Sequence, residues 1–236
     1  MRNFFFFSFF LSFSILSAQE VLSNLISNPV LNKNKFIIKY SKSPLVLPFF
    51  DDFSYDSNTV TSNLWFQSSV FVNRTYALNP PTIGVATFDG LDAFGFARDF
   101  NQFNNSEPSD TLLSRQIDLS LSNSVYLMFY YQAKGIGDSP ELQDKLVLEF
   151  LNDTLGWEEV WHSDDTILQD FTKVVKLINE SRFLFDSFQF RFRNYATISG
   201  NFDHWHIDYV KLDEFLNSTD TIQLDDVSFV YQSPSF

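Results

Sequence analysis

The sequence contains no cysteine among its 236 residues. This absence excludes a thiol nucleophile, an iron–sulfur cluster, a disulfide framework and any zinc site with cysteine ligands. Histidine is scarce as well, with three residues, so few pairs of nucleophile and base are available for covalent catalysis. Lysine and arginine number 16 against 29 acidic residues, and the formal net charge is -13. Because phosphate binding needs clustered basic side chains, we expect no nucleic-acid partner.

The glycine patterns of nucleotide-binding loops are also missing. The seven glycines form neither G-x-G-x-x-G nor G-x-x-x-x-G-K, and there is no G-x-S-x-G or H-E-x-x-H. Acidic residues occur in adjacent pairs such as Glu158–Glu159 and Asp164–Asp165. Adjacent residues of a strand point to opposite faces, whereas a glycosidase needs two carboxylates that converge. We therefore expect no catalytic residues, and a protein that is not an enzyme.

A long apolar run occurs only at the N-terminus. Met1–Asn3 carries one basic residue, Phe4–Leu16 is apolar apart from serines, and Ser17–Ala18 supplies small residues. This is the layout of a secretory signal, and the run is too short to cross a bilayer of about 30 Å. We predict that residues 1–18 are a signal peptide read by the export machinery and removed after Ala18. The mature chain is then secreted or held at the cell surface, and does not span the membrane.

From residue 47 onward, short apolar or alternating runs recur between clusters of polar residues, proline and glycine. Phe188–Arg193 has a strict period of two, with three phenylalanines on one face and a glutamine and two arginines on the other. Val125–Gln132 is apolar on both faces, which is typical of a central strand covered on both sides. Further strands are expected at Lys145–Leu151, Trp157–Trp161, Val174–Ile178 and Trp205–Leu212. Many strands with little helix predict an all-β, antiparallel β-sandwich.

Two segments carry a resemblance to known modules. The first is Asn79–Asp92, with the sequence NPPTIGVATFDGLD. The second comprises the aromatic strand Phe188–Phe192, a turn at Gly200 and the strand Asp203–Val210, with the sequence DHWHIDYV. This second segment is similar to the closing hairpin of MAM-like and carbohydrate-module jelly rolls, which implies a jelly-roll (MAM-like or concanavalin-like) sandwich. The stretch 47–212 resembles the N-terminal region of Bacteroidetes cell-surface proteins that the type IX secretion system exports.

These features divide the chain into four parts. After the signal peptide, residues 19–46 form a polar leader segment, and residues 47–215 form the jelly-roll domain. Residues 216–236 begin a following strand or segment, and the chain stops directly after the strand-like run Asp226–Tyr231. We therefore expect a piece of a longer surface protein.

A calcium site is the first candidate for bound metal. Asp51 and Asp52 lie at the start of the expected sandwich, and Asp208 lies in its expected last strand. In many jelly rolls these two strands are neighbours. Calcium takes six to eight oxygen ligands, which carboxylates and backbone carbonyls supply. The alternative is that these acids are exposed strand ends in a chain rich in acidic residues.

His204 and His206 are the second candidate, because alternate residues of a strand project to the same side. They would supply two zinc ligands, with Asp208 or His162 as the third. An isolated H-x-H is a weak motif. We therefore expect instead that both histidines flank the core residue Trp205 and face solvent.

Exposed aromatic side chains are the candidates for ligand binding. Of the four tryptophans, Trp157 and Trp161 lie beside acidic residues and an expected turn, so they fit a buried core least well. Aromatic rings pack against the apolar faces of sugars. Because a charge of -13 repels polyanions, the expected partner is a neutral glycan or a surface protein.

Four threonines follow an aspartate and precede an aliphatic residue. This pattern resembles the O-glycosylation acceptor of Bacteroidetes, and each copy is expected in a loop or at the start of a strand. The four residues are Thr111, Thr154, Thr166 and Thr221.

The function predicted from the sequence is a non-catalytic, exported cell-surface module for adhesion or for glycan or protein binding, within a larger bacterial surface protein. A structural spacer domain of a type IX-secreted protein is one alternative, and an accessory part of a polysaccharide hydrolase is another. Binding on a glycan array separates the binding module from the spacer. Two convergent carboxylates in a cleft would support the hydrolase.

Overall fold

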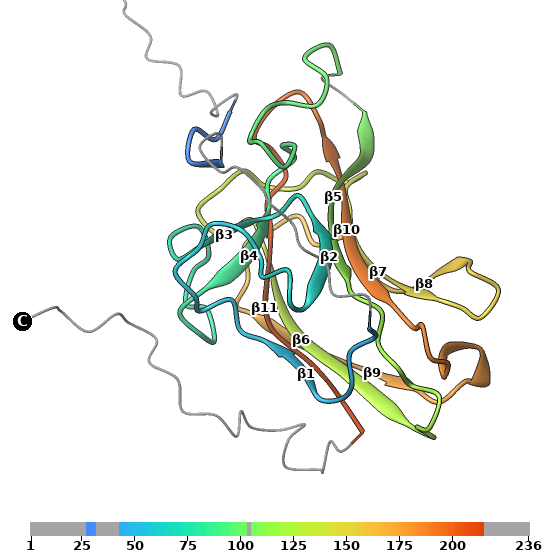
Figure 1. Cartoon of the computed structure of the whole chain (residues 1–236). Coiled ribbons are helices and arrows are strands. Elements are labelled where there is room, and N and C mark those ends of the chain that lie inside the picture. Colours follow the sequence, from blue (N-terminus) through green and yellow to red (C-terminus); the bar gives the residue numbers. More distant parts are fainter. Residues whose placement is uncertain (1–26, 32–42, 103–104, 215–236) are drawn as a thin grey trace, which may run out of the picture.

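A computed structural model describes residues 27–31, 43–102 and 105–214 (Figure 1). The predicted signal peptide (residues 1–18), the segment 216–236 and Thr221 lie outside the described residues. The described part consists mainly of strands and loops, with a 3-10 turn at Ser181–Phe183. No helix in these ranges is long and apolar enough to cross a membrane.

The strands are β1 (Phe49–Asp51), β2 (Trp65–Ser68), β3 (Phe71–Asn73), β4 (Val85–Phe88), β5 (Ser106–Ser114), β6 (Val125–Ala133), β7 (Lys145–Leu151), β8 (Trp157–Ser163), β9 (Thr172–Ile178), β10 (Phe190–Thr197) and β11 (Trp205–Asp213).

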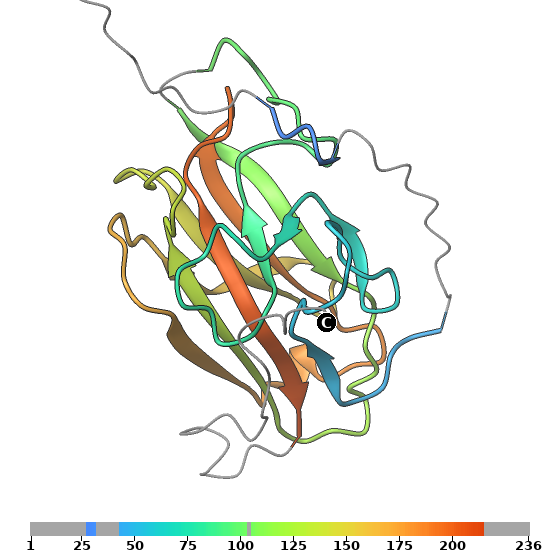
Figure 2. The same cartoon turned by 90° about the vertical axis from the view of Figure 1, so that its left-hand side faces the viewer.

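The strands form two antiparallel sheets that pack face to face (Figures 1 and 2). One sheet has the order β3-β4-β11-β6-β9, and β1 also pairs with β11. The other has the order β2-β5-β10-β7-β8. The chain crosses between the sheets at every connection except β3–β4 and β7–β8. The predicted all-β jelly-roll sandwich is confirmed.

Aromatic side chains from both sheets fill the space between them. Phe188, Phe190 and Phe192 are all fully buried, as their period of two predicted. The ring of Phe192 lies edge-on to Phe129 of the facing sheet, with 4.8 Å between ring centroids. Phe190 makes the same kind of contact with Phe49, at 5.2 Å. Edge-on packing is the favoured geometry of aromatic pairs.

Strand β5 is an element that the sequence pattern did not indicate. Its first half contains Glu107, Pro108, Ser109 and Asp110, which read as a loop. Pro108 pairs with Tyr195 of β10, but β2 pairs only with the second half of β5. One edge of β5 is therefore unpaired at Pro108, and proline is tolerated on such an edge. Ser109 and Asp110 are buried despite being polar, because other side chains satisfy their hydrogen bonds.

Short pieces of the expected leader also contact the sandwich. The backbone N–H of Asn28 donates to the carbonyl of Gly95, at 2.7 Å. Leu45 forms a parallel bridge with Ile117. The packed unit therefore includes residues upstream of 47.

Candidate ligand-binding face

The outward side of the five-stranded sheet carries a group of charged and aromatic side chains. Since Phe190 and Phe192 point into the core, alternation directs Arg191, Arg193 and Tyr195 of β10 outward. The neighbouring strands β7 and β8 pair with β10 and β7 respectively and add residues to the same side. We call this surface the polar face, defined by Lys145, Glu149, Trp157, Glu159, Arg191, Arg193 and Tyr195.

Glu149 is the central anion of the polar face. It accepts a hydrogen bond from Arg191 Nε at 2.6 Å and one from Arg193 Nη2 at 3.1 Å. Arg193 Nη2 also donates to the hydroxyl of Tyr195, at 3.2 Å. The side chain of Glu149 is only 9% exposed, so these charge-assisted bonds are shielded and hold both guanidinium groups in place.

Glu159 is the second anion of this surface. Lys145 Nζ donates to it at 2.9 Å, and His162 Nδ1 lies 2.7 Å from its other oxygen. Partial burial would by itself raise the pKa of Glu159, but the hydrogen bonds from Lys145 and His162 outweigh it and lower that pKa. Glu159 therefore remains a charged acceptor.

Two aromatic rings lie among these charges. The guanidinium carbon of Arg191 lies 4.1 Å from the ring centroid of Trp157. Lys145 Nζ and Arg193 Cζ lie 5.1 Å and 5.3 Å from the ring centroid of Tyr195. Cation–π contacts of this length hold the rings in position.

The structure places the two predicted ligand-binding tryptophans on different sides of β8. Trp161 pairs with the core residue Leu148, and its ring packs edge-on against Phe129 and Tyr131 of the facing sheet, at 5.1 Å and 4.9 Å. A shift of register between Leu148 and the next residue of β7 places Trp157 on the polar face instead. The two rings therefore do not form one binding platform.

The polar face offers fixed donors, fixed acceptors and aromatic surface together. Hydroxyl-rich ligands need hydrogen-bond partners of both kinds beside apolar surface. The sequence prediction missed Glu149, Arg191, Arg193 and Tyr195 as site residues. One feature of the sequence does indicate this face. In Phe188–Arg193 both arginines alternate with the buried phenylalanines, so they point away from the core.

Strands β1 and β11 are neighbours, as the sequence predicted, and Asp51 pairs with Val210. The three predicted calcium ligands nevertheless have separate partners. Asp51 accepts hydrogen bonds from Trp65 Nε1 at 2.6 Å and from the N–H of Phe53 at 2.9 Å. Burial raises the pKa of Asp51 to about 6.

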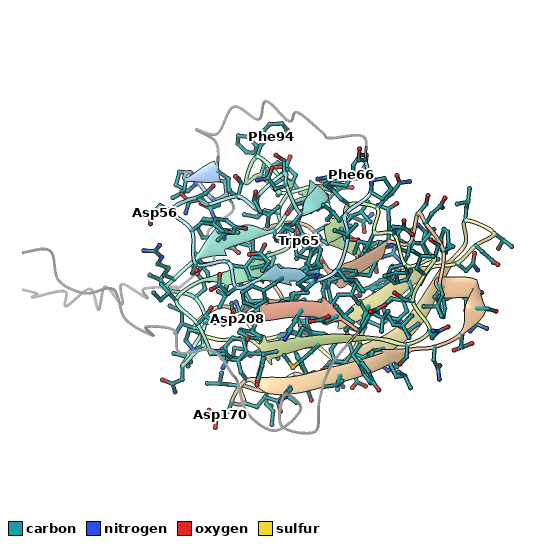
Figure 3. The ribbon with its side chains drawn as sticks, turned by 60° about the horizontal axis from the view of Figure 1, so that its bottom comes forward. Asp56, Trp65, Phe66, Phe94, Asp170 and Asp208 are labelled. Atoms are coloured by element: carbon teal, nitrogen blue, oxygen red, sulfur yellow. The ribbon has the colours of Figure 1, made fainter. Side chains whose placement is uncertain are left out.

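Asp52 accepts from the hydroxyl and the N–H of Ser54, at 2.7 Å and 3.1 Å. Asp208 lies in β11 (Figure 3) and is fully buried. Its carboxylate accepts hydrogen bonds from the N–H and the hydroxyl of Thr82, both at 2.8 Å. The hydroxyl of Thr82 also lies 2.8 Å from the carbonyl oxygen of Asp52. Burial raises the pKa of Asp208 to about 7. Calcium at Asp51, Asp52 and Asp208 stays a prediction.

The expectation that His204 and His206 face solvent is wrong, because both are buried. The loop after β6 covers them: the N–H of Asp138 donates to His204 Nδ1 at 2.9 Å. His206 Nδ1 lies 2.9 Å from the hydroxyl of Thr87, and its Nε2 lies 3.2 Å from the carbonyl of Lys134. Because a carbonyl only accepts, Nε2 carries a proton, and the lowered pKa of His206 makes the ring neutral. Burial lowers the pKa of His206 to about 3 and that of His204 to about 4.

Glycine allows this loop to lie so close to the histidines. A Cβ atom on Gly137 would come within 2.4 Å of the ring of His204. Gly135 has a φ of 56°, and its Cβ would meet the carbonyl of Tyr76 at 2.2 Å. The buried histidines are therefore part of a packed loop interface, and the predicted third ligand His162 lies elsewhere, beside Glu159.

Carboxylates from distant parts of the sequence do converge, which the adjacent acid pairs could not indicate. Asp89 and Asp110 are both buried, and Arg98 Nη2 pairs with Asp110 at 3.0 Å. The N–H groups of Asp89 and Gly90 also donate to Asp110. Burial, with the charge of Asp110 second, raises the pKa of Asp89 well above its ordinary value. This cluster is closed to solvent and supports the loop after β4.

A separate apolar hollow of about 60 Å³ lies beside β2, lined among others by Val60, Trp65, Phe66 and Ala93. Phe66 is 45% exposed and Phe94 is 54% exposed, and both lie at the edge of the molecule (Figure 3). Five hydrogen-bonding side chains also line this hollow: Thr59, Ser62, Gln67, Ser68 and Ser69.

The described glycosylation candidates occupy three different settings. Thr154 is exposed in the turn between β7 and β8, and Thr166 is partly exposed in the loop after β8. Thr111 lies inside β5, paired with Arg193, and not in a loop or at a strand start as expected.

No family model and no curated protein matches this sequence. Among similar solved structures is the K1 cleaved adhesin domain of Lys-gingipain from Porphyromonas gingivalis W83, with 9% identity, 72% of this chain and 99% of that chain covered, and a TM-score of 0.41. The CBM22-1 xylan-binding domain of Paenibacillus barcinonensis Xyn10C has 9% identity, coverage of 72% and 96%, and a TM-score of 0.39. An exo-beta-agarase has 9% identity and a TM-score of 0.46, with 72% of this chain but 25% of that chain covered. At 9% identity these likenesses concern the fold alone.

Proposed function

We propose that this chain is a non-catalytic, exported cell-surface module that binds a neutral glycan through the polar face. The observation that carries the proposal is the preorganised group around Glu149: two arginines held by one shielded carboxylate, beside the rings of Trp157 and Tyr195. Preorganised donors and aromatic surface lower the entropy cost of binding a flexible ligand.

The balance of charge on the polar face favours an uncharged ligand. Lys145, Arg191 and Arg193 lie against Glu149 and Glu159, so most of the positive charge is neutralised locally. A polyanion would need an excess of cations. Sugar hydroxyls, in contrast, can share the donors and acceptors that these ion pairs leave partly unused.

Glycoside hydrolysis needs an accessible pair of carboxylates on either side of the bond that is cleaved. Asp89 and Asp110 are buried, and Glu149 and Glu159 are each held by two basic groups. The described residues thus favour a binding role over a hydrolytic one.

The test is binding to a glycan array and to neutral polysaccharides in affinity electrophoresis, with a hydrolysis assay alongside. Trp157→Ala and Tyr195→Ala should each weaken binding roughly tenfold, because one aromatic contact contributes about 1 kcal/mol or more. Phe66→Ala, at an exposed aromatic of β2 that is not part of the polar face, is the matched control and should leave affinity unchanged.

Loss of binding in Phe66→Ala alone would move the site to the apolar hollow. Turnover that one carboxylate substitution abolishes would revive the hydrolase. Failure to bind any glycan would favour the spacer domain. Export through residues 1–18, the type IX route and glycosylation at Thr154 are parts of the same proposal, and mass spectrometry of the exported protein tests them.

A further inference from the structure

The β6–β7 and β10–β11 loops meet at one end of the sandwich. Lys145, at the start of β7, pairs with Tyr195 near the end of β10. Ala133, at the end of β6, pairs with Trp205 at the start of β11. Each loop leads the chain from one sheet to the other, so a link between them would tie both sheets together.

Three carboxylates from these loops converge. Glu141 and Asp144 lie in the first loop and Asp203 in the second, and one oxygen of each lies within 4.8 Å of the others. Asp144 and Asp203 are each 1% exposed, and Glu141 is exposed to solvent. Backbone N–H groups orient the buried pair: Glu141 donates to Asp144 Oδ2 and Thr197 donates to Asp203 Oδ2, both at 2.7 Å.

No basic side chain of the described residues forms an ion pair with any of the three. Lys134, in the same loop, donates instead to the hydroxyl of Ser139, at 2.9 Å. The cluster therefore has no protein cation paired with it in the part of the chain that the structure describes.

A second observation concerns unpaired oxygens. Asp144 Oδ1 is buried and has no hydrogen-bond partner in the part of the chain that the structure describes. In the turn of the second loop, Asn201 Oδ1 is also buried and unpaired. A buried acceptor without a partner costs free energy, and a bound cation would satisfy Asp144 Oδ1 directly.

We propose that Glu141, Asp144 and Asp203 bind a calcium ion that joins the two crossover loops. Oxygens that bind one ion at 2.3–2.6 Å lie up to about 5 Å apart, which agrees with the spacing of the three carboxylates. An all-oxygen ligand set in irregular loops suits calcium better than zinc, which prefers nitrogen and sulfur, or magnesium, which demands regular octahedral geometry. Water at the open side of Glu141 completes the coordination.

This site is separate from the one predicted at Asp51, Asp52 and Asp208, and it does not depend on glycan binding. Its role is to stabilise the fold at the end of the sandwich where β7 and β11 begin.

The test is thermal melting and isothermal titration calorimetry of chelator-treated protein with CaCl2, and with MgCl2 for comparison. At calcium a hundred times its dissociation constant, the melting temperature should rise by roughly 5–10 °C. Magnesium should give a smaller rise. The absence of calcium binding at millimolar concentration would overturn the proposal.

Asp144→Asn and Glu141→Gln locate the ion. Both should abolish the calcium-dependent rise. Asp144→Asn should also melt at a higher temperature than the wild type in chelator, because it removes one unbalanced buried charge. Asp52→Asn, which keeps the acceptor for Ser54, is the matched control and should retain the rise. A rise that survives Asp144→Asn and Glu141→Gln but disappears in Asp52→Asn would overturn this assignment.

Discussion

Truncation of Phe190 to alanine removes the centre of the aromatic core. Phe190 is fully buried and its ring lies edge-on to three others: Phe49 at 5.2 Å, Trp65 at 5.7 Å and Phe192 at 6.0 Å. Removing a buried phenylalanine costs about 3–5 kcal/mol, since both the transfer free energy and the packing around the cavity are lost. The upper half of this range is expected here, because three ring pairs are lost together.

Equilibrium unfolding in urea measures this free energy, and the slope with denaturant shows whether the unfolded state has changed. The melting temperature should fall by roughly 10 °C or more, as each kcal/mol shifts a domain of this size by about 2–4 °C. Leu121→Ala, at a side chain that is 94% exposed, is the control and should change stability by less than about 0.5 kcal/mol. A loss below about 1 kcal/mol for Phe190→Ala would refute the central place of this ring in the core.

Three further predictions follow from the loops and the termini. Gly137→Ala should destabilise the fold by about 1–3 kcal/mol, because its Cβ would overlap the ring of His204; Gly156→Ala, with its closest contact at 3.1 Å, should cost less in the same urea titration. His206 has a lowered pKa in the folded state, so its contribution to stability is present above about pH 6.5 and is lost as the pH falls towards its folded value of about 3. Between pH 7.5 and pH 5 the wild type should therefore lose about 2 kcal/mol relative to His206→Asn, whereas parallel pH profiles of the two proteins would contradict a buried neutral imidazole. N-terminal sequencing of the exported protein should begin at Gln19, and a sequence beginning at Met1 would contradict the signal peptide.

Local alternation explains why several strands could be predicted. Lys145–Leu151 and the Phe190–Phe192 pair lie in strands as expected, because a period of two states directly which residues share a face. In β5 the buried positions include Ser109 and Asp110. Their hydrogen-bond partners are Arg98, which lies before β5 in the sequence, and Asn194, which lies in β10. No pattern within β5 itself therefore showed that this segment is buried.

The candidate sites were likewise predicted only where the local sequence was sufficient. Trp157 was correctly placed outside the core by its polar neighbours, but the register shift in β7 and β8 separates it from Trp161. The converging group of Glu141, Asp144 and Asp203 joins two loops about sixty residues apart in the sequence. Neither a register shift nor a contact between distant loops leaves a periodic trace in the chain.

The sequence by itself determined the all-β class, the identity of the core phenylalanines and the outward position of the arginines in β10, because each depends on the pleat of a single strand. Only the tertiary structure decided what covers each outer face. Period two places His204 and His206 opposite the core residue Trp205, and an uncovered strand would leave them in water. The loop of Gly135 and Gly137 closes over them instead. Burial depends on contacts between segments that are distant in the sequence, and such contacts form only when the two sheets and their crossover loops have assembled.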